Sequence, residues 1–210
     1  MTVKKYQRPD DNLYAHALKK VFIIHIFMFI VAFTAAIIAR SSSVLADSLD
    51  FVGDAISYAL SLYVLSKGAI WATIIAIAKA VTMLSFGVPV MFYALLRFED
   101  GAAPNYEIMN ISGLLGIISH IICLRILFKF KSGDSNRLSV WICTINDLLS
   151  NIITVMAAAA VMITGSVIPD IVAAMIIIMI AIYGAIIILK QAIKEIKQLK
   201  AKGNNANYNS

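Results

Sequence analysis

The chain has 210 residues, of which 60% are hydrophobic and 14% are charged, and its formal net charge is +6. A soluble globular domain is nearer half apolar and a quarter charged, so this composition indicates a membrane protein. The basic residues stand at the ends of apolar runs, where they act as a topology signal, and we therefore expect no nucleic-acid partner.

Six apolar segments are each long enough to cross a bilayer, since a run of about 18 or more residues with few charges suffices. They cover residues 21–39, 44–65, 69–96, 108–128, 138–165 and 169–189. Lipid offers the backbone no hydrogen-bond partner, so each segment must be helical, and short connections make neighbouring helices antiparallel. Pro89 in the third segment predicts a kink or a broken hydrogen-bond ladder. The predicted fold class is an all-α membrane protein with six transmembrane helices.

Lysine and arginine are distributed unequally between the two ends of this predicted bundle. Only Arg40 and Arg97 lie in the connections on one side, whereas both tails and the remaining connections carry the other flanking basic residues. The positive-inside rule therefore predicts that both termini are cytoplasmic. We expect a cytoplasmic tail over residues 1–20 without a cleavable signal peptide, a transmembrane domain over 21–189, and a basic cytoplasmic tail over 190–210 that continues the sixth helix. The expected location is the bacterial inner (plasma) membrane, with multiple passes.

The second segment contains three acids that are costly inside a membrane. Each ionisable side chain at the centre of a membrane helix costs at least about 2.5–3.5 kcal/mol. Asp47, Asp50 and Asp54 follow one another at offsets that place all three on one helical face. Asp50 and Asp54 are one turn, roughly 6 Å, apart, and two carboxylates that close must share a proton or hold a cation. For Asp47 two interpretations stay open, a structural helix cap or support for the site.

The fifth segment repeats this spacing with Cys143 and Asp147. If the second and fifth helices face each other, Asp50, Asp54, Cys143 and Asp147 converge as four ligands of one metal ion. Three carboxylates and a thiolate suit zinc, which accepts sulfur, better than magnesium or calcium, which prefer oxygen. Taken alone, a cysteine in this position is more often a small buried hydrophobic residue.

Other polar residues in the apolar segments each have two interpretations. Asn146 and Asn151 either support the metal site or form hydrogen bonds between helices. Lys79 either offsets acidic charge when no metal is bound or extends toward the membrane surface. Asp170 resembles the start of a helix after a proline, which predicts a structural role.

Two histidines, His25 and His120, lie in the first and fourth segments. Together they could bind a haem or lie on a proton path. A single histidine in a helix is more often a packed, hydrogen-bonded residue, and neither histidine is assigned to the metal site.

Two motifs resemble those of the cation diffusion facilitator (CDF) family, the proton-coupled exporters of zinc and related ions. They are LADSLDFVGD in the second segment and WICTINDLLSN in the fifth. In that family, an acid or histidine followed four residues later by aspartate recurs in both helices and forms the transport site between six helices. Asp50 and Asp54 match the first pair, and Asp147 matches the aspartate of the second.

The sequence departs from the family pattern in three places. Cys143 stands where the fifth-helix pair usually begins with histidine, so the family's ion preference does not carry over. The chain ends shortly after the sixth segment and so resembles a truncated subgroup without the family's cytoplasmic metal-binding domain. The family's histidine-rich loop between the fourth and fifth helices has no counterpart in FKFKSGDSNR.

These features predict a secondary active transporter, not an enzyme, that exports a divalent metal cation by alternating access in exchange for protons. Zn²⁺ is the leading cargo, and Cd²⁺, Co²⁺, Fe²⁺ and Mn²⁺ stay open. No permanently bound cofactor is expected. The expected partners are the metal ion, protons as counter-ion and the lipid bilayer. A homodimer is compatible with the family, although no residue indicates one.

Two other classes of function stay open at this point. One is a metal-sensing or accessory membrane protein, which would bind the ion without transporting it. The other is an intramembrane aspartyl protease in which Asp54 and Asp147 form a dyad that shares a proton. Phe51 stands at the first glycine of the Gly-x-Gly-Asp signature of such proteases, which argues against this alternative.

Overall fold

Helices make up nearly all of the described chain. The computed structural model describes residues 10–65, 67, 69–132 and 134–208. The six α-helices are α1 (Asp11–Ala39), α2 (Ser42–Val64), α3 (Ala69–Asp100), α4 (Tyr106–Leu127), α5 (Ser135–Thr164) and α6 (Ile168–Tyr208). A short 3-10 helix, Phe128–Phe130, follows α4, and the described residues contain no strand. The prediction of an all-α protein with six helices is confirmed.

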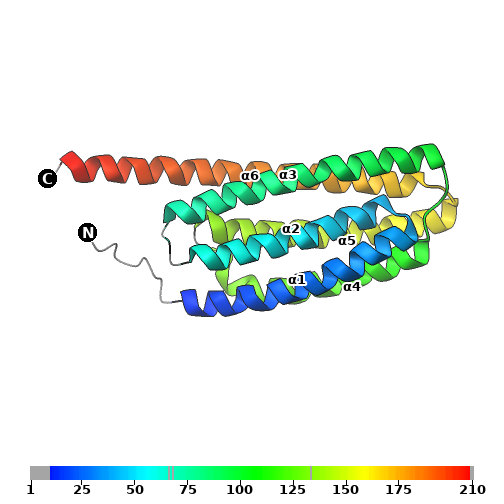
Figure 1. The fold of residues 1–210 in the computed structure, drawn as a ribbon, viewed down its shortest axis with the longest axis horizontal. Coiled ribbons are helices and arrows are strands. Elements are labelled where there is room, and N and C mark those ends of the chain that lie inside the picture. Colours follow the sequence, from blue (N-terminus) through cyan, green and yellow to red (C-terminus); the bar gives the residue numbers. More distant parts are fainter. Residues whose placement is uncertain (1–9, 66, 68, 133, 209–210) are drawn as a thin grey trace.

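The helices form an elongated bundle in which consecutive helices run in opposite directions (Figure 1). The start of α1 and the end of α6 lie at the same end of this bundle, where α6 continues past the other helices. α1 begins at Asp11 rather than at residue 21, because Tyr14 and Leu18 of its first turns pack in a buried cluster with Phe130. α3 continues through Pro89 and is not broken there. Neighbouring groups in a helix bundle can satisfy the backbone groups that a proline releases.

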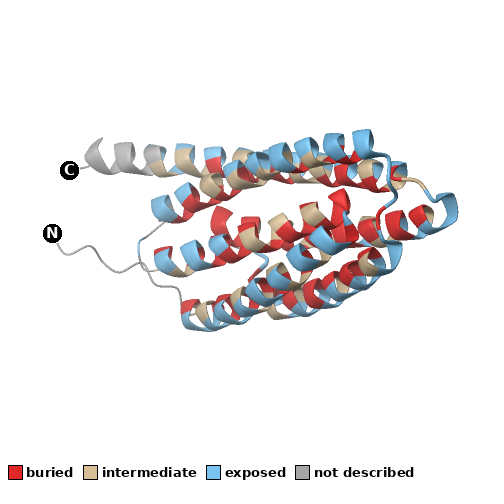
Figure 2. Cartoon of the chain, turned by 45° about the vertical axis from the view of Figure 1, so that its right-hand side comes forward, coloured by how far each residue is buried: buried red, intermediate tan, exposed pale blue. Residues whose placement is uncertain are grey.

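The bundle exposes large apolar side chains and buries many polar ones, as a protein surrounded by lipid should. Phe27, Ile30 and Phe92 are each 60% exposed or more. The buried residues face the inside of the bundle (Figure 2). Within the described part of the chain, five helices are long and apolar enough to cross a membrane. α2 falls short because its three aspartates and its serines lower its hydropathy.

α2 is the central helix of the bundle. It contacts each of the other five helices. Because α2 is surrounded in this way, its neighbours shield its acids from lipid, which lowers the free-energy cost of placing them in the membrane.

The N-terminus of α2 is capped from two directions. The side chain of Ser41 accepts a hydrogen bond from the backbone N–H of Val44 (3.1 Å). Asp170 of α6 accepts hydrogen bonds from the backbone N–H groups of Ser42 and Ser43 (2.6 and 3.0 Å) and from the hydroxyls of Ser41 and Ser43 (2.7 and 2.6 Å). A carboxylate at a helix N-terminus also interacts favourably with the helix dipole. The structural role predicted for Asp170 is confirmed.

Buried arginines connect helices at both ends of the bundle. Arg137, at the start of α5, forms ion pairs with Asp10 and Asp11 beside the start of α1 (2.6 and 2.9 Å). Near the opposite end, Arg97 of α3 donates a hydrogen bond from Nε to the backbone carbonyl of Arg40 (2.9 Å). These contacts tie α1 to α5 at one end and α3 to the α1–α2 connection at the other.

Candidate metal site

The four residues predicted as metal ligands line one small cavity between α2, α3 and α5. Asp50 and Asp54 of α2 and Cys143 and Asp147 of α5 all contribute to its wall. The remaining wall residues are Gly53, Ser57, Lys79, Thr82, Met83 and Phe86. The cavity volume is about 10 Å³, which is near the size of one water-sized sphere. The sequence suggested that α2 and α5 face each other, and in the structure they do. Ion binding by these four residues stays a prediction.

Asp54 is the centre of a buried polar network. The hydroxyl of Tyr58 donates to its Oδ2 at 2.5 Å. The ammonium nitrogen of Lys79 lies 3.4 Å from its Oδ1, and Nε2 of His25 lies 3.7 Å from its Oδ2. Its carboxyl group also neighbours that of Asp147 on the facing helix. An acid with four polar neighbours in a membrane helix has the surroundings of a functional group.

Lys79 reaches this network from α3 and not toward the membrane surface. Its side chain is only 2% exposed, and its Nζ lies 5.1 Å from the centre of the Tyr58 ring in addition to its contact with Asp54. Of the two interpretations of Lys79, the structure agrees with the one in which it offsets buried acidic charge.

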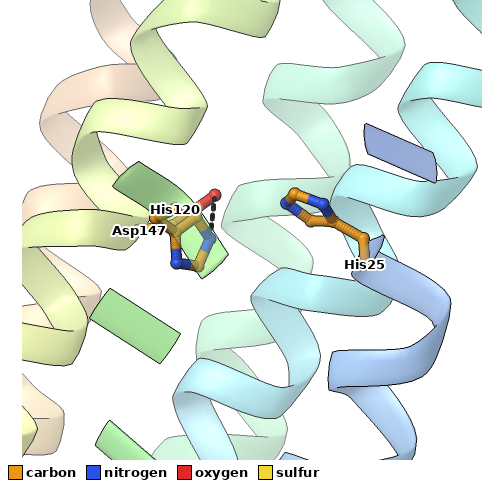
Figure 3. A group of neighbouring side chains, drawn as sticks. All are labelled: His25, His120 and Asp147. Carbon is orange, nitrogen blue, oxygen red and sulfur yellow. Dashed lines mark ion pairs between the residues drawn. The ribbon is translucent and has the colours of Figure 1, made fainter. Parts of the chain in front are cut away.

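A second group of polar side chains lies directly behind Asp147. Nε2 of His120 is 3.7 Å from Oδ2 of Asp147. The rings of His25 and His120 meet edge to face with their centroids 5.4 Å apart. Ligand atoms of His25, His120 and Asp147 all lie within 4.8 Å of one another, and the His25 ring is turned toward the other two (Figure 3). Rings in such contact leave no room for a haem between them.

His25 and His120 were not among the metal ligands predicted from the sequence. His25 is on α1 and His120 is on α4, and only the contact between these two helices brings them together. A histidine pair on different helices has no spacing that a single sequence reveals.

Cys143 and Asp50 differ in their surroundings. Cys143 is 1% exposed, and its S–H group donates to Sδ of Met83 at 3.3 Å. It also packs in an apolar cluster with Ala76 and Ala80, so it is a buried hydrophobic residue on one side and part of the cavity wall on the other. Asp50 is half-buried, and it is therefore the most accessible of the four predicted ligands.

The two asparagines of α5 face different neighbours. Asn151 donates to the backbone carbonyl of Asp147 at 2.8 Å, and its amide nitrogen lies 3.5 Å from Nδ1 of His120. Asn146 instead packs against Gly184 of α6, where an added Cβ would lie 2.1 Å from its Nδ2. Asn151 is thus beside the polar network, whereas Asn146 lies at a helix contact.

Asp47 does not cap its helix. Ser41 occupies the N-cap position of α2, and Asp47 lies within the helix with a side chain that is almost completely buried. The capping interpretation of Asp47 is therefore wrong. The helix begins earlier because Ser41 and Asp170 satisfy its first N–H groups.

Most of the chain matches a known protein family. Residues 18–196 match the model of the cation efflux transmembrane domain, a match that includes α2 to α5, both acidic motifs and most of α1 and α6. No curated protein matches the chain in sequence. Members of the family are membrane transporters of metal cations and not enzymes in the catalytic sense. The chain therefore belongs to the cation efflux (CDF) family and is an integral, multi-pass membrane protein.

Proposed function

We propose that this protein exports a divalent metal cation, with Zn²⁺ as the leading cargo, in exchange for protons. The observation that carries the proposal is the small cavity lined by Asp50, Asp54, Cys143 and Asp147. Two helices supply these four groups, and α2 contacts every other helix of the bundle. A shift of the surrounding helices about α2 and α5 would open the cavity to one side of the membrane and then to the other.

Lys79 balances the charge of the site when no ion is bound. Its ammonium group pairs with Asp54 in a nearly dry interior, where an isolated carboxylate would be costly. A divalent cation that binds Asp54 must weaken this ion pair, because the ammonium group and the metal repel each other. Lys79 therefore acts as a tethered competitor that prevents the ion from binding too tightly to be released.

Protons serve as the counter-ion because the ligands must lose them before they bind metal. The neighbouring carboxyl groups of Asp54 and Asp147 cannot both remain charged at low cost without a cation between them. Protons that enter from the far side after the metal leaves would neutralise this pair. The empty site then returns to the cytoplasmic side with protons in place of the ion.

The orientation and range of cargo follow from the sequence. The basic residues that flank the helices favour cytoplasmic termini, in the bacterial inner (plasma) membrane, and hence export from the cytoplasm. Carboxylates and one thiolate could also hold Cd²⁺, Co²⁺, Fe²⁺ or Mn²⁺.

The neighbouring carboxyl groups also meet one condition for an aspartyl protease dyad. However, Asp54 is already paired with Lys79 and Tyr58, and the cavity beside it is about 10 Å³, far too small for a peptide. The family consists of transporters, so we do not propose a protease.

The test is zinc transport by the purified full chain in proteoliposomes that contain a fluorescent zinc indicator. We expect zinc to accumulate when the lumen is more acidic than the outside and to stop accumulating when an ionophore removes the pH gradient. Accumulation that is indifferent to the gradient would overturn proton exchange. Saturable zinc binding without flux would identify a sensor or accessory protein instead.

A further inference from the structure

The rings of His25 and His120 are held in the orientation that metal-binding histidines adopt. Nδ1 of His25 lies 2.8 Å from the backbone carbonyl oxygen of Val21, and Nδ1 of His120 lies 2.9 Å from that of Gly116. A carbonyl oxygen can only accept a hydrogen bond, so each ring carries its proton on Nδ1. Nε2 of each neutral ring therefore keeps its lone pair. That of His25 lies 3.3 Å from the hydroxyl of Tyr58, which already donates its proton to Asp54. Histidine ligands of metals donate their other N–H to a backbone carbonyl in this way.

Each of these lone pairs faces a carboxylate oxygen at a distance that is too long for a hydrogen bond. The two gaps, from His25 to Asp54 and from His120 to Asp147, are both 3.7 Å. Within the described part of the chain, Nε2 of His120 and Oδ2 of Asp147 have no hydrogen-bond partner, although these side chains are almost completely buried. An acceptor facing an acceptor in a dry interior is unfavourable unless a cation or a proton lies between them.

The gaps have the size that a bound zinc ion would require. Zinc bonds to nitrogen and oxygen are about 2.0–2.2 Å long, so two ligand atoms of a tetrahedral site stand roughly 3.4 Å apart. Both observed gaps exceed this separation by only a few tenths of an ångström. Phe51 stacks on the His120 ring with centroids 4.8 Å apart and also contacts His25. The contact with His120 is a face-to-face stack and that with His25 is T-shaped, so Phe51 steadies both rings, and the stack leaves the in-plane Nε2 of His120 uncovered.

We propose that His25, His120, Asp54 and Asp147 form a second metal-binding position, which takes the same borderline divalent cations, Zn²⁺ above all. Four different helices, α1, α4, α2 and α5, each supply one of these ligands. Two imidazoles and two carboxylates are a ligand set that suits tetrahedral zinc. The inference rests on the proposed function in so far as it describes a further step on the path of the transported ion.

The second position shares Asp54 and Asp147 with the first, so one ion occupies one position at a time. An ion that leaves Asp50 and Cys143 can pass to the two histidines while both shared carboxylates keep hold of it. Only two of its four ligands are exchanged in this step. Lys79 pairs with Oδ1 of Asp54, whereas His25 faces Oδ2. An ion at the second position therefore weakens the ion pair between Lys79 and Asp54 less than an ion at the first position does.

Zinc X-ray absorption spectroscopy tests the second position directly, because imidazole and sulfur ligands give different scattering. The sample is the full chain in lipid nanodiscs, purified without a histidine tag and loaded with one equivalent of zinc. The chain has three histidines, and the third, His16, is exposed on α1. His16→Gln is therefore the matched control, since any imidazole scattering that remains in it comes from His25 or His120.

We expect imidazole scattering to persist in His16→Gln, to persist in His16→Gln/Cys143→Ser, and to vanish in His25→Gln/His120→Gln. In the last variant the ion should remain bound with a sulfur ligand at the first position. Absence of imidazole scattering from His16→Gln at saturating zinc would overturn the second position, and this result does not depend on the folding of the double variant.

Zinc flux in liposomes separates this inference from the proposed function. Flux without imidazole coordination would overturn the second position alone. Imidazole coordination without flux would support the second position as a binding site and overturn transport.

Discussion

The ammonium nitrogen of Lys79 on α3 lies 3.4 Å from Oδ1 of Asp54 on α2, with both side chains nearly inaccessible. This ion pair joins the helix that carries the central acids to a helix that carries none of the predicted ligands. Any ion that binds Asp54 changes the strength of the contact between α2 and α3. The pair thus links occupancy of the site to the packing of the bundle.

Replacement of Lys79 by methionine should strengthen zinc binding. Without the competing ammonium group, we expect the Kd for zinc to fall at least about tenfold, which corresponds to about 1.4 kcal/mol. Transport should nevertheless slow, because the ion leaves the site less readily. Equilibrium dialysis and liposome flux measure the two effects separately.

The same variant should be less stable without metal, since removing one partner of a buried ion pair costs about 3–5 kcal/mol. Zinc should therefore raise the Tm of Lys79→Met more than that of the unchanged protein. Lys79→Arg, which keeps the charge, is the control and should bind zinc nearly as the unchanged protein does. Weaker zinc binding by Lys79→Met would mean that Lys79 positions Asp54 and does not compete with the ion.

Loss of either shared carboxylate should abolish transport. Asp54→Asn and Asp147→Asn each remove an anionic ligand while keeping the size of the side chain, so we expect flux at the level of empty liposomes. Glu107→Gln, an exposed acid in the first turn of α4, is the control and should transport normally. Full transport by both variants, with protein in the membrane at normal levels, would show that the site has been misplaced.

The parts of the site that were predictable from sequence are those with a helical spacing. Asp50 and Asp54 lie four residues apart, as do Cys143 and Asp147, and these repeats predicted a shared cavity that the structure contains. His25 and His120 have no such repeat, because each faces the centre from a helix that is otherwise apolar in that region. Only tertiary contact between α1 and α4 makes them a pair.

The number of helices was predictable from the sequence, but their ends were not, because tertiary contacts determine where some of them begin. Hydropathy predicts that the first segment begins near residue 21, yet α1 begins at Asp11 because Tyr14 and Leu18 pack against other parts of the bundle. Likewise, the capping group of α2 could not be read from its own sequence alone. Much of its N-terminus is satisfied by Asp170, which follows it by well over a hundred residues.

Replacement of Cys143 by histidine should keep transport but change the order of preferred ions. A soft thiolate favours Cd²⁺ relative to Zn²⁺, whereas an imidazole suits zinc and cobalt. We therefore expect the ratio of cadmium to zinc flux to fall in Cys143→His. Competition between the two ions on one liposome preparation measures this ratio. An unchanged ratio would show that the sulfur is not a ligand and serves only to pack against Met83.

Asp170→Ala should destabilise the protein without changing its ion preference. The carboxylate accepts four hydrogen bonds from Ser41, Ser42 and Ser43, and each bond to a charged group contributes about 1.5–3 kcal/mol. We expect a clear fall in Tm, a smaller fall in Asp170→Asn, and the same ratio of cadmium to zinc flux in both variants. A changed ratio would place Asp170 on the ion path and contradict its purely structural role.

Gly116 should be required for the geometry of the histidine side of the site. A Cβ at Gly116 would lie 1.6 Å from Oδ1 of Asn151, so Gly116→Ala must displace this asparagine or separate α4 from α5. Either movement changes the distance between His120 and Asp147. The amide of Asn151 donates a hydrogen bond to the backbone carbonyl of Asp147 and lies beside the His120 ring. We expect zinc flux to fall strongly in Gly116→Ala and little in the control Gly87→Ala, where the nearest atom would be 3.3 Å away.

The steric cause can be separated from a general loss of stability with a double variant. Asn151→Ala removes the atoms that a Cβ at Gly116 would meet, so Gly116→Ala should cost much less flux in the Asn151→Ala background than alone. Such non-additivity is expected only when two residues share one contact. Equal losses in both backgrounds would show that Gly116 acts through another neighbour, and the arrangement of Asn151 against α4 would then not control the site.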